Sequence, residues 1–273
     1  MKHIYLNLKR FDIPKSLHGV NNLTSIDTWA QHIISYIEHM GDKNITVFLP
    51  ELHLLEALKV CNHVKIGAQS IHYKDVEQGA NFGAFTTYRT ASILRALHVK
   101  DVIIGHLEER MGIEEQNQMG KGNLDPNLLL NMKMKLAAQQ QMQILYCVGE
   151  KLHEQERKYE VIKHQLDVGL KDVDLSCVTI AYEPVWAIGV GKTPPTKAYI
   201  VDIVNYIKSL YPLNVVYGGG LKLENAAMLG SIDQLDGGLI ALTRFGQDFG
   251  FYLEDFSDIV EAYLKEAKNE NHI

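Results

Sequence analysis

Eight short runs of apolar, often β-branched residues recur along the 273-residue chain, each bounded by turn-forming residues. They span residues 4–8, 45–50, 64–69, 101–106, 143–149, 178–184, 213–219 and 237–243. Most are apolar almost throughout, which is typical of strands covered on both faces. Stretches with helical spacing of apolar residues, such as 26–40 and 199–211, lie between them. This alternation predicts an α/β protein, and eight strand–helix units favour a closed (β/α)8 barrel over an open sheet.

Nothing in the composition divides this pattern into separate units. No Pro/Ser-rich linker or low-complexity run interrupts it, so we expect residues 1–273 to form a single barrel domain. The formal net charge of −6 argues against a nucleic-acid surface, which needs a clustered basic face.

The sequence also carries no sign of export or of a disulfide framework. Nowhere do 18 apolar residues run together, and the first residues lack the apolar core of a signal peptide. Cys61, Cys147 and Cys177 lie far apart and form no CxxC pattern, which indicates neither disulfides nor a zinc site. We therefore expect a cytoplasmic protein that contacts no membrane.

Polar residues at the carboxyl ends of barrel strands point into the mouth where such enzymes keep their sites. Asn7 and Lys9 follow the first predicted strand, His106 ends the fourth and Glu183 ends the sixth. Each also has a plain structural interpretation: a solvated lysine, a hydrogen-bonded histidine, or a glutamate paired with a nearby cation. Glu183 is the strongest candidate, because Pro184 restrains it at the edge of a low-dielectric mouth where a carboxylate becomes a useful base.

Two loops complete the set of candidates. Residues 184–195, "PVWAIGVGKTPP", resemble a lid with a restrained hinge at each end, which would exclude water from the mouth. The alternative is a surface loop whose tryptophan packs on a helix. The glycines of "YGGG" (217–220) offer backbone N–H groups to an anion, although glycine runs are also common turns.

Together these segments closely resemble the triosephosphate isomerase family. "NLK" at 7–9 resembles the family's Asn-x-Lys, "GHLEER" at 105–110 its catalytic histidine segment, and "YEPVWAIGVGKT" at 182–193 its base and lid. "YGGG" matches the phosphate loop, and "GAQSI", "GAFTTYRT" and "CVGEKL" fall in family order, so the resemblance spans almost the whole chain.

The resemblance implies a role for each catalytic candidate. Glu183 would be the general base that moves a proton between adjacent carbons, and His106 the neutral group that polarises the carbonyl oxygen; the family is itself a well-known example of such tuning. Lys9 would stabilise negative charge and Asn7 would help to place the substrate. Glu108 matches the acidic residue that supports the lysine.

The resemblance also implies what the site binds. The substrate would be a small phosphorylated ketose or aldose, and no metal or organic cofactor is needed to shift a proton between carbons. The residues expected to hold the phosphate are Gly189, Gly219, Gly220, Ala241 and Leu242. A homodimer would form through the loop around Thr86.

Several positions depart from the family pattern. Leu107 stands in place of a serine, Glu109 in place of an arginine and Gly220 in place of a serine. Ala241 and Leu242 replace two glycines, and Arg244 offers a compensating phosphate contact or is a surface residue.

Three functions are therefore open. The first is isomerisation of dihydroxyacetone phosphate to glyceraldehyde 3-phosphate through an enediolate. The second is the same reaction on a related tetrulose phosphate, and the third is a catalytically silent binding homologue. The complete catalytic set disfavours the third.

Overall fold

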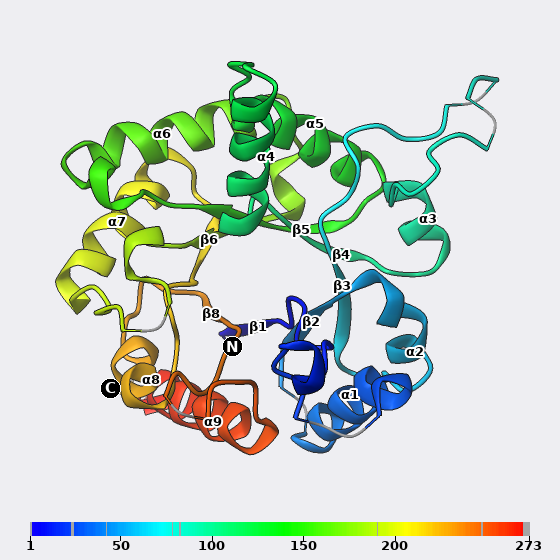
Figure 1. Cartoon of the computed structure of the whole chain (residues 1–273). Coiled ribbons are helices and arrows are strands. Elements are labelled where there is room, and N and C mark those ends of the chain that lie inside the picture. The colour runs from blue at the N-terminus through cyan, green and yellow to red at the C-terminus, as the bar shows by residue number, and fades with distance from the viewer. Residues whose placement is uncertain are drawn as a thin grey trace.

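The computed structural model describes residues 2–22, 25–41, 43–77, 79–81, 83–189, 191–246 and 248–269. Within these residues, eight parallel strands close into a barrel in chain order, with β8 hydrogen-bonded back to β1 (Figure 1). The strands are β1 His3–Asn7, β2 Ile45–Leu49, β3 Lys65–Gln69, β4 Asp101–Ile104, β5 Gln143–Val148, β6 Val178–Tyr182, β7 Asn214–Tyr217 and β8 Gly237–Ile240. The predicted fold class is confirmed.

Helices surround this barrel on its outer face (Figure 1). They are α1 Trp29–His39, α2 Leu54–Leu58, α3 Ala91–Ala96, α4 Leu107–Met119, α5 Pro126–Gln139, α6 Lys158–Gly169, α7 Lys197–Leu210, α8 Leu223–Gly230 and α9 Leu253–Asn269. Among the described residues, none of these combines the length and the apolar character that crossing a membrane requires.

All eight predicted strands are present, but several end earlier than the apolar runs suggested. β4 ends at Ile104 and β8 at Ile240, where the predictions extended to 106 and 243. At the end of β4, Gly105 adopts a φ of +78°, which takes the chain out of the strand and into the site loop. Apolar composition alone does not distinguish such loop residues from strand residues.

The helical predictions are confirmed with shifted ends. Residues 26–28 form a 3-10 turn before α1, and α7 begins at Lys197, two residues ahead of the apolar pattern. The side chain of Thr196 accepts a hydrogen bond from the Tyr199 N–H, so it caps this helix.

The core has two layers because successive strand residues point to opposite faces. Inward-facing side chains fill the barrel itself: Tyr5, Phe48, Ile103, Leu145, Cys147, Ala181, Val216 and Leu239. Outward-facing residues such as Ile4 and Leu6 pack against the helices in a second, larger cluster. The filled interior leaves functional side chains to the two mouths of the barrel.

The loop between β3 and α3 projects away from the barrel, at the upper right of Figure 1. Thr86 is exposed on this loop, and 57% of Tyr88 is accessible. The ring of Tyr88 stacks on His72 with a centroid distance of 4.0 Å.

Candidate active site

Glu183 and His106 meet at the carboxyl ends of β6 and β4. Glu183 follows β6 directly, and only 3% of its surface is exposed. Its Oε1 lies 3.4 Å from His106 Nε2, and its Oε2 accepts a 3.1 Å hydrogen bond from the Leu107 backbone N–H. Because Leu107 holds the carboxylate through its backbone, this contact does not need the serine of the family pattern.

The hydrogen bonds of His106 define its tautomer. His106 is the N-cap of α4, and its Nδ1 accepts the backbone N–H of Glu108 at 3.3 Å. A ring nitrogen that accepts a hydrogen bond carries no proton, so this network assigns the ring proton to Nε2. The neutral ring therefore presents an N–H donor toward Glu183.

Two glycines make room for Glu183. A Cβ on Gly149 would lie 1.7 Å from the carbonyl oxygen of Glu183, and one on Gly218 would lie 3.0 Å from its Cγ. The backbones of β5 and β7 therefore approach the glutamate closely, as only glycine permits. Cys147 lies in the same layer, and burial first, then the charge of Glu183, raises the pKa of its thiol well above the usual value.

Lys9 is held at the mouth by residues of β1, β3 and α4. The backbone φ of Lys9 is +41°, which is unusual for any residue other than glycine. Its side-chain Nζ lies 2.7 Å from Glu108 Oε1. Asn7 Oδ1 accepts the Lys9 N–H at 3.0 Å. Gln69 donates to both Asn7 Oδ1 and the Lys9 carbonyl oxygen, each at 3.1 Å, and so fixes this turn.

Electrostatics at Lys9 favour an ionised Glu108. Burial raises the pKa of the Glu108 carboxyl, but the charge and hydrogen bond of Lys9 outweigh burial and lower that pKa.

Glu109 connects the ends of β3 and β4. Its Oε2 accepts the Gly105 N–H at 2.7 Å, while its Oε1 is bonded by the Ser70 hydroxyl and the Lys133 ammonium of α5. Ser70 and Gly105 both have left-handed backbones, with φ of +76° and +78°. One carboxylate thus holds two tight turns, a strained one at Ser70 after Gln69 and a glycine turn before His106.

The lid is anchored by the fully buried Glu150. Its Oε1 accepts hydrogen bonds from Trp186 Nε1 at 2.7 Å and from the hydroxyl groups of Tyr199 at 2.9 Å and Tyr182 at 3.0 Å. Burial first, then Glu150, raises the pKa of both tyrosines, so both remain donors. Trp186 also packs edge-on against Tyr199 of α7, with ring centroids 5.7 Å apart. The predicted lid with its hinges spans residues 184–195, of which residue 190 lies outside the described residues.

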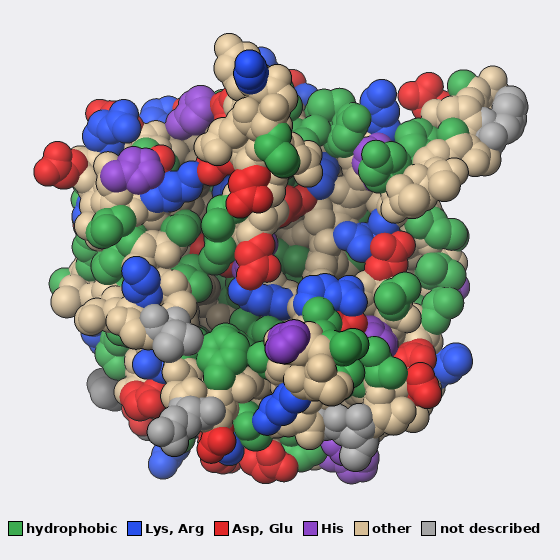
Figure 2. All heavy atoms as spheres, viewed as in Figure 1, with side chains coloured by type: hydrophobic (Ala, Val, Ile, Leu, Met, Phe, Trp, Pro, Cys, Tyr) green, Lys and Arg blue, Asp and Glu red, His purple; other side chains and the backbone are tan. Residues whose placement is uncertain are grey.

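Seven of the predicted site residues line one cavity of about 100 Å³: Asn7, Lys9, His106, Gly189, Gly220, Ala241 and Leu242. Apolar walls come from residues such as Ile188 and Phe245. Among the described lining residues, Lys9 alone carries a positive charge. Figure 2 shows charged side chains of both signs beside a hollow at the centre of this face.

Three predicted residues lie outside that lining. Glu183 is buried behind His106, and Glu108 contacts Lys9 Nζ at 2.7 Å. Gly219 is turned toward Tyr217, whose hydroxyl donates to the Gly219 carbonyl oxygen at 2.9 Å.

Arg244 is paired with Asp255 and does not line the cavity at Lys9. Two of its nitrogens contact the Asp255 carboxylate at 2.5 and 2.9 Å, and its guanidinium lies 3.8 Å from the ring centroid of Tyr252. Backbone bonds between Arg244 and Gly250 close this loop after β8. In the part of the chain that the structure describes, no group of three or more His, Cys, Asp or Glu residues is arranged to hold a metal ion.

Sequence reasoning missed three supporting residues. Gln69 and Glu150 follow the third and fifth predicted strands and were expected only to face the mouth, and Glu109 was only a departure from the family pattern. The partners that give these residues their supporting roles lie far away in the sequence.

Comparison with known proteins agrees with this geometry. The model of the family described as triosephosphate isomerase matches residues 18–263. The chain belongs to the triosephosphate isomerase family. It is therefore an isomerase with the barrel architecture of that family.

Individual relatives show how far the similarity extends. Triosephosphate isomerase of Alkaliphilus metalliredigens is 32% identical over 216 residues, which cover 73% of this chain and 80% of the relative. That of Fusobacterium nucleatum subsp. nucleatum is 31% identical over 258 residues, 89% of this chain and 94% of the relative. A crystal structure of triosephosphate isomerase from Bartonella henselae matches with a TM-score of 0.71 at 24% identity, covering 96% and 99% of the two chains.

Proposed function

We propose that the chain interconverts dihydroxyacetone phosphate and glyceraldehyde 3-phosphate at the cavity formed by Lys9, His106 and the lid. The observation that carries the proposal is the 3.4 Å approach of His106 Nε2 to Glu183 Oε1 beside that cavity. A base and a neutral N–H donor are thereby placed next to each other, as proton transfer beside a carbonyl requires.

The reaction begins with an exchange of hydrogen-bond partners. The substrate carbonyl oxygen replaces Glu183 Oε1 as the acceptor of the His106 Nε2–H. Glu183 then removes a proton from the carbon next to the carbonyl, and the electron pair moves to the oxygen to form the enediolate. His106 Nε2 gives its proton to the former carbonyl oxygen and takes the hydroxyl proton from the neighbouring oxygen, while the carboxyl of Glu183 returns its proton to the former carbonyl carbon. Ketose and aldose thus differ in the place of one carbon-bound and one oxygen-bound proton.

Lys9 stabilises the negative charge that develops on the enediolate oxygen and on the phosphate. Glu108 holds the ammonium at 2.7 Å, and Asn7 contributes an amide to substrate placement. The strained φ of Lys9 supports this role, because such conformations persist where the surrounding structure fixes them and cluster at functional sites.

The phosphate is assigned to the opposite wall of the cavity. Gly189 of the lid and Gly220 after β7 have φ values of +118° and +81°, and their backbone N–H groups, with those of Ala241 and Leu242, are the proposed donors. Gly219, which was expected to contribute, does not line the cavity. Closure of the lid over the phosphate would exclude water from the enediolate.

The relatives that the chain matches favour a triose over a tetrulose phosphate, because they are triosephosphate isomerases. Leu242 and Phe245 bound the cavity of about 100 Å³ on one side, and a cavity of about 140 Å³ that shares Asn7, Lys9 and His106 adjoins it. We also propose a homodimer through the exposed loop around Thr86, testable by sedimentation.

Rate measurements on dihydroxyacetone phosphate and on a tetrulose phosphate test the proposal. We expect the larger kcat/KM for the triose. If a protein with correct circular dichroism turned over neither substrate, the proposal would be wrong, and preference for the tetrulose would replace the substrate assignment.

A further inference from the structure

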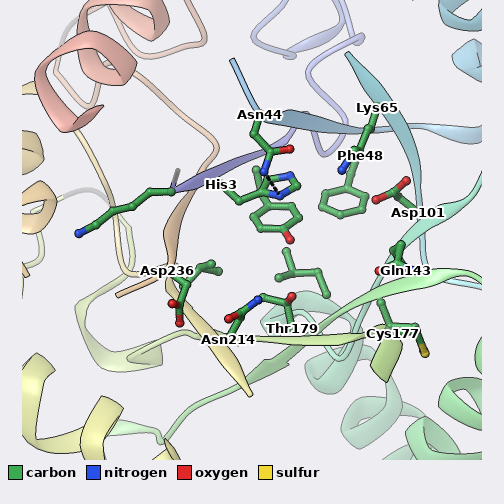
Figure 3. Close-up of a pocket in the computed structure, with 15 residues that line it drawn as sticks. His3, Asn44, Phe48, Lys65, Asp101, Gln143, Cys177, Thr179, Asn214 and Asp236 are labelled. Atoms are coloured by element: carbon green, nitrogen blue, oxygen red, sulfur yellow. Dashed lines mark hydrogen bonds between the residues drawn. The ribbon is translucent and has the colours of Figure 1, made fainter. Parts of the chain in front are cut away.

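The opposite mouth of the barrel holds a second and larger cavity, of about 370 Å³ (Figure 3). It lies where the strands begin, and polar residues that start β1, β3, β4, β5 and β7 line it: His3, Lys65, Asp101, Gln143 and Asn214. Its volume is within the range of small-molecule sites, roughly 300–1,000 Å³. Its lining shares no residue with that of the cavity at Lys9 and His106, because the filled barrel interior separates the two.

Several polar groups in this cavity are already satisfied. His3 accepts a hydrogen bond from Asn44 at Nδ1, and its Nε2 bonds the Thr46 hydroxyl at 2.9 Å. Asp236 accepts the Val215 N–H and is paired with Lys208. Because these side chains already have partners, they line the cavity but have few hydrogen bonds left to form with a ligand.

Asp101 is different, because its carboxylate forms no hydrogen bond or ion pair with any described residue. Only 8% of the residue's surface is exposed, and its carboxylate oxygens are accessible from the cavity. Burial raises the pKa of Asp101 to about 6, although the charges of Lys65 and Lys100 lower it in part. Buried carboxylates are normally paired, and unpaired ones in a cavity indicate function.

Lys65 supplies the opposite charge in the same cavity. Figure 3 shows its side chain and that of Asp101 on either side of the Phe48 ring. No ion pair joins them among the described contacts, so a carboxylate and an ammonium face one space without neutralising each other directly. The amides of Gln143 and Asn214, which form no side-chain hydrogen bond to described residues, add donors and acceptors.

We propose that this cavity binds a small zwitterion of the amino acid class, with its ammonium at Asp101 and its carboxylate at Lys65. A ligand with a single charge would form an ion pair with either Asp101 or Lys65 and would be repelled by the other residue. A neutral polyol carries no charge and would bind without the ion pairs to Asp101 and Lys65. Charge-assisted hydrogen bonds are about twice as strong as neutral ones. The two amides would accept and donate the remaining hydrogen bonds.

NMR titration of the full-length protein with glycine and L-serine tests the site, with ethylamine, acetate and glycerol as probes that lack one or both charges. We expect the amino acids to shift signals around Asp101 and Lys65 and to bind about tenfold or more tightly than the other probes. Asp101→Asn and Lys65→Met should each weaken binding of the amino acids about tenfold.

A matched pair of variants controls for the loss of charge. Asp172→Asn and Lys135→Met remove a surface ion pair of 3.4 Å outside the lining and should leave binding unchanged. The proposal is overturned if wild-type protein shows no shifts around the cavity up to the solubility limit of the amino acids. It is also overturned if glycerol, acetate or ethylamine binds as tightly, or if the two cavity variants bind like their controls. Asp101→Asn removes a buried charge, so a folded variant is expected and is checked by circular dichroism.

Discussion

The two mouths of this barrel differ in whether their charged side chains are paired with one another. At the carboxyl ends of the strands, Glu183 and His106 lie 3.4 Å apart and Lys9 is paired with Glu108 at 2.7 Å. At the amino ends, Asp101 and Lys65 share a cavity without forming an ion pair. Charged groups at the first mouth are paired with one another, and we propose that they exchange partners when substrate binds. At the second mouth the Asp101 carboxylate has no direct partner among the described residues, and the charges of Lys65 and Lys100 offset only part of the cost of its burial.

The largest effect on kcat is expected from replacing the proposed base, Glu183. Glu183→Gln keeps the shape of the side chain but removes its ability to take a proton, so we expect kcat to fall by about 10³-fold or more. Steady-state assays with dihydroxyacetone phosphate measure this loss. Asp101→Asn, a matched carboxylate-to-amide change at the other mouth, should keep wild-type kcat; equal losses in both variants would contradict separate roles for the mouths.

Removal of the mouth cation should have the next largest effect. Lys9→Met retains the aliphatic stem but deletes the charge that stabilises the enediolate and phosphate, so kcat/KM should fall by about 10²–10³-fold. Competition by inorganic phosphate should weaken in parallel. Unchanged phosphate affinity would place the anion away from Lys9.

Asp101→Asn should stabilise the protein at neutral pH. The pKa of Asp101 is raised to about 6 in the folded state from its usual value of 3.8, so ionisation is disfavoured by folding. The cost is absent below about pH 4, grows as the pH rises to about 6 and then stays constant at about 3 kcal/mol, because one pKa unit corresponds to about 1.4 kcal/mol.

Urea unfolding at pH 8 and at pH 4 measures that difference. The variant should gain most of the 3 kcal/mol at pH 8 and almost none at pH 4. A gain of equal size at both pH values would show that the charge of Asp101 is not its cause.

Glu109→Gln should have the smallest effect. The amide retains the size of the side chain but weakens the contact with Lys133 and removes one acceptor from the bonds to Ser70 and Gly105. We expect kcat to fall about tenfold with little change in KM, since the variant loosens groups around His106 without touching substrate. Lys135→Met, which removes a surface cation of the same helix, serves as the control.

The barrel could be predicted from the sequence because each strand is a short apolar run and each helix has apolar residues at a regular spacing. Both patterns depend only on residues that are neighbours in the sequence. The polar residues Asn7, Lys9 and His106 could be placed at one mouth because a residue at a strand end has a defined direction, whereas Gly189, Gly220, Ala241 and Leu242 of the same cavity were expected from the family resemblance. The bonds of Gln69 to Asn7 and of Glu150 to Trp186 join residues 62 and 36 positions apart, and no local pattern encodes them. The isolation of Asp101 could not be predicted either, because it follows from what surrounds it in space.

The most direct test of the account is a crystal structure of the Glu183→Gln variant with dihydroxyacetone phosphate. The phosphate should lie against Gly189, Gly220 and the backbone of Ala241 and Leu242, with the carbonyl oxygen within hydrogen-bond distance of His106 Nε2. A closed cavity at Lys9, or substrate bound only at the mouth that contains Asp101, would contradict it.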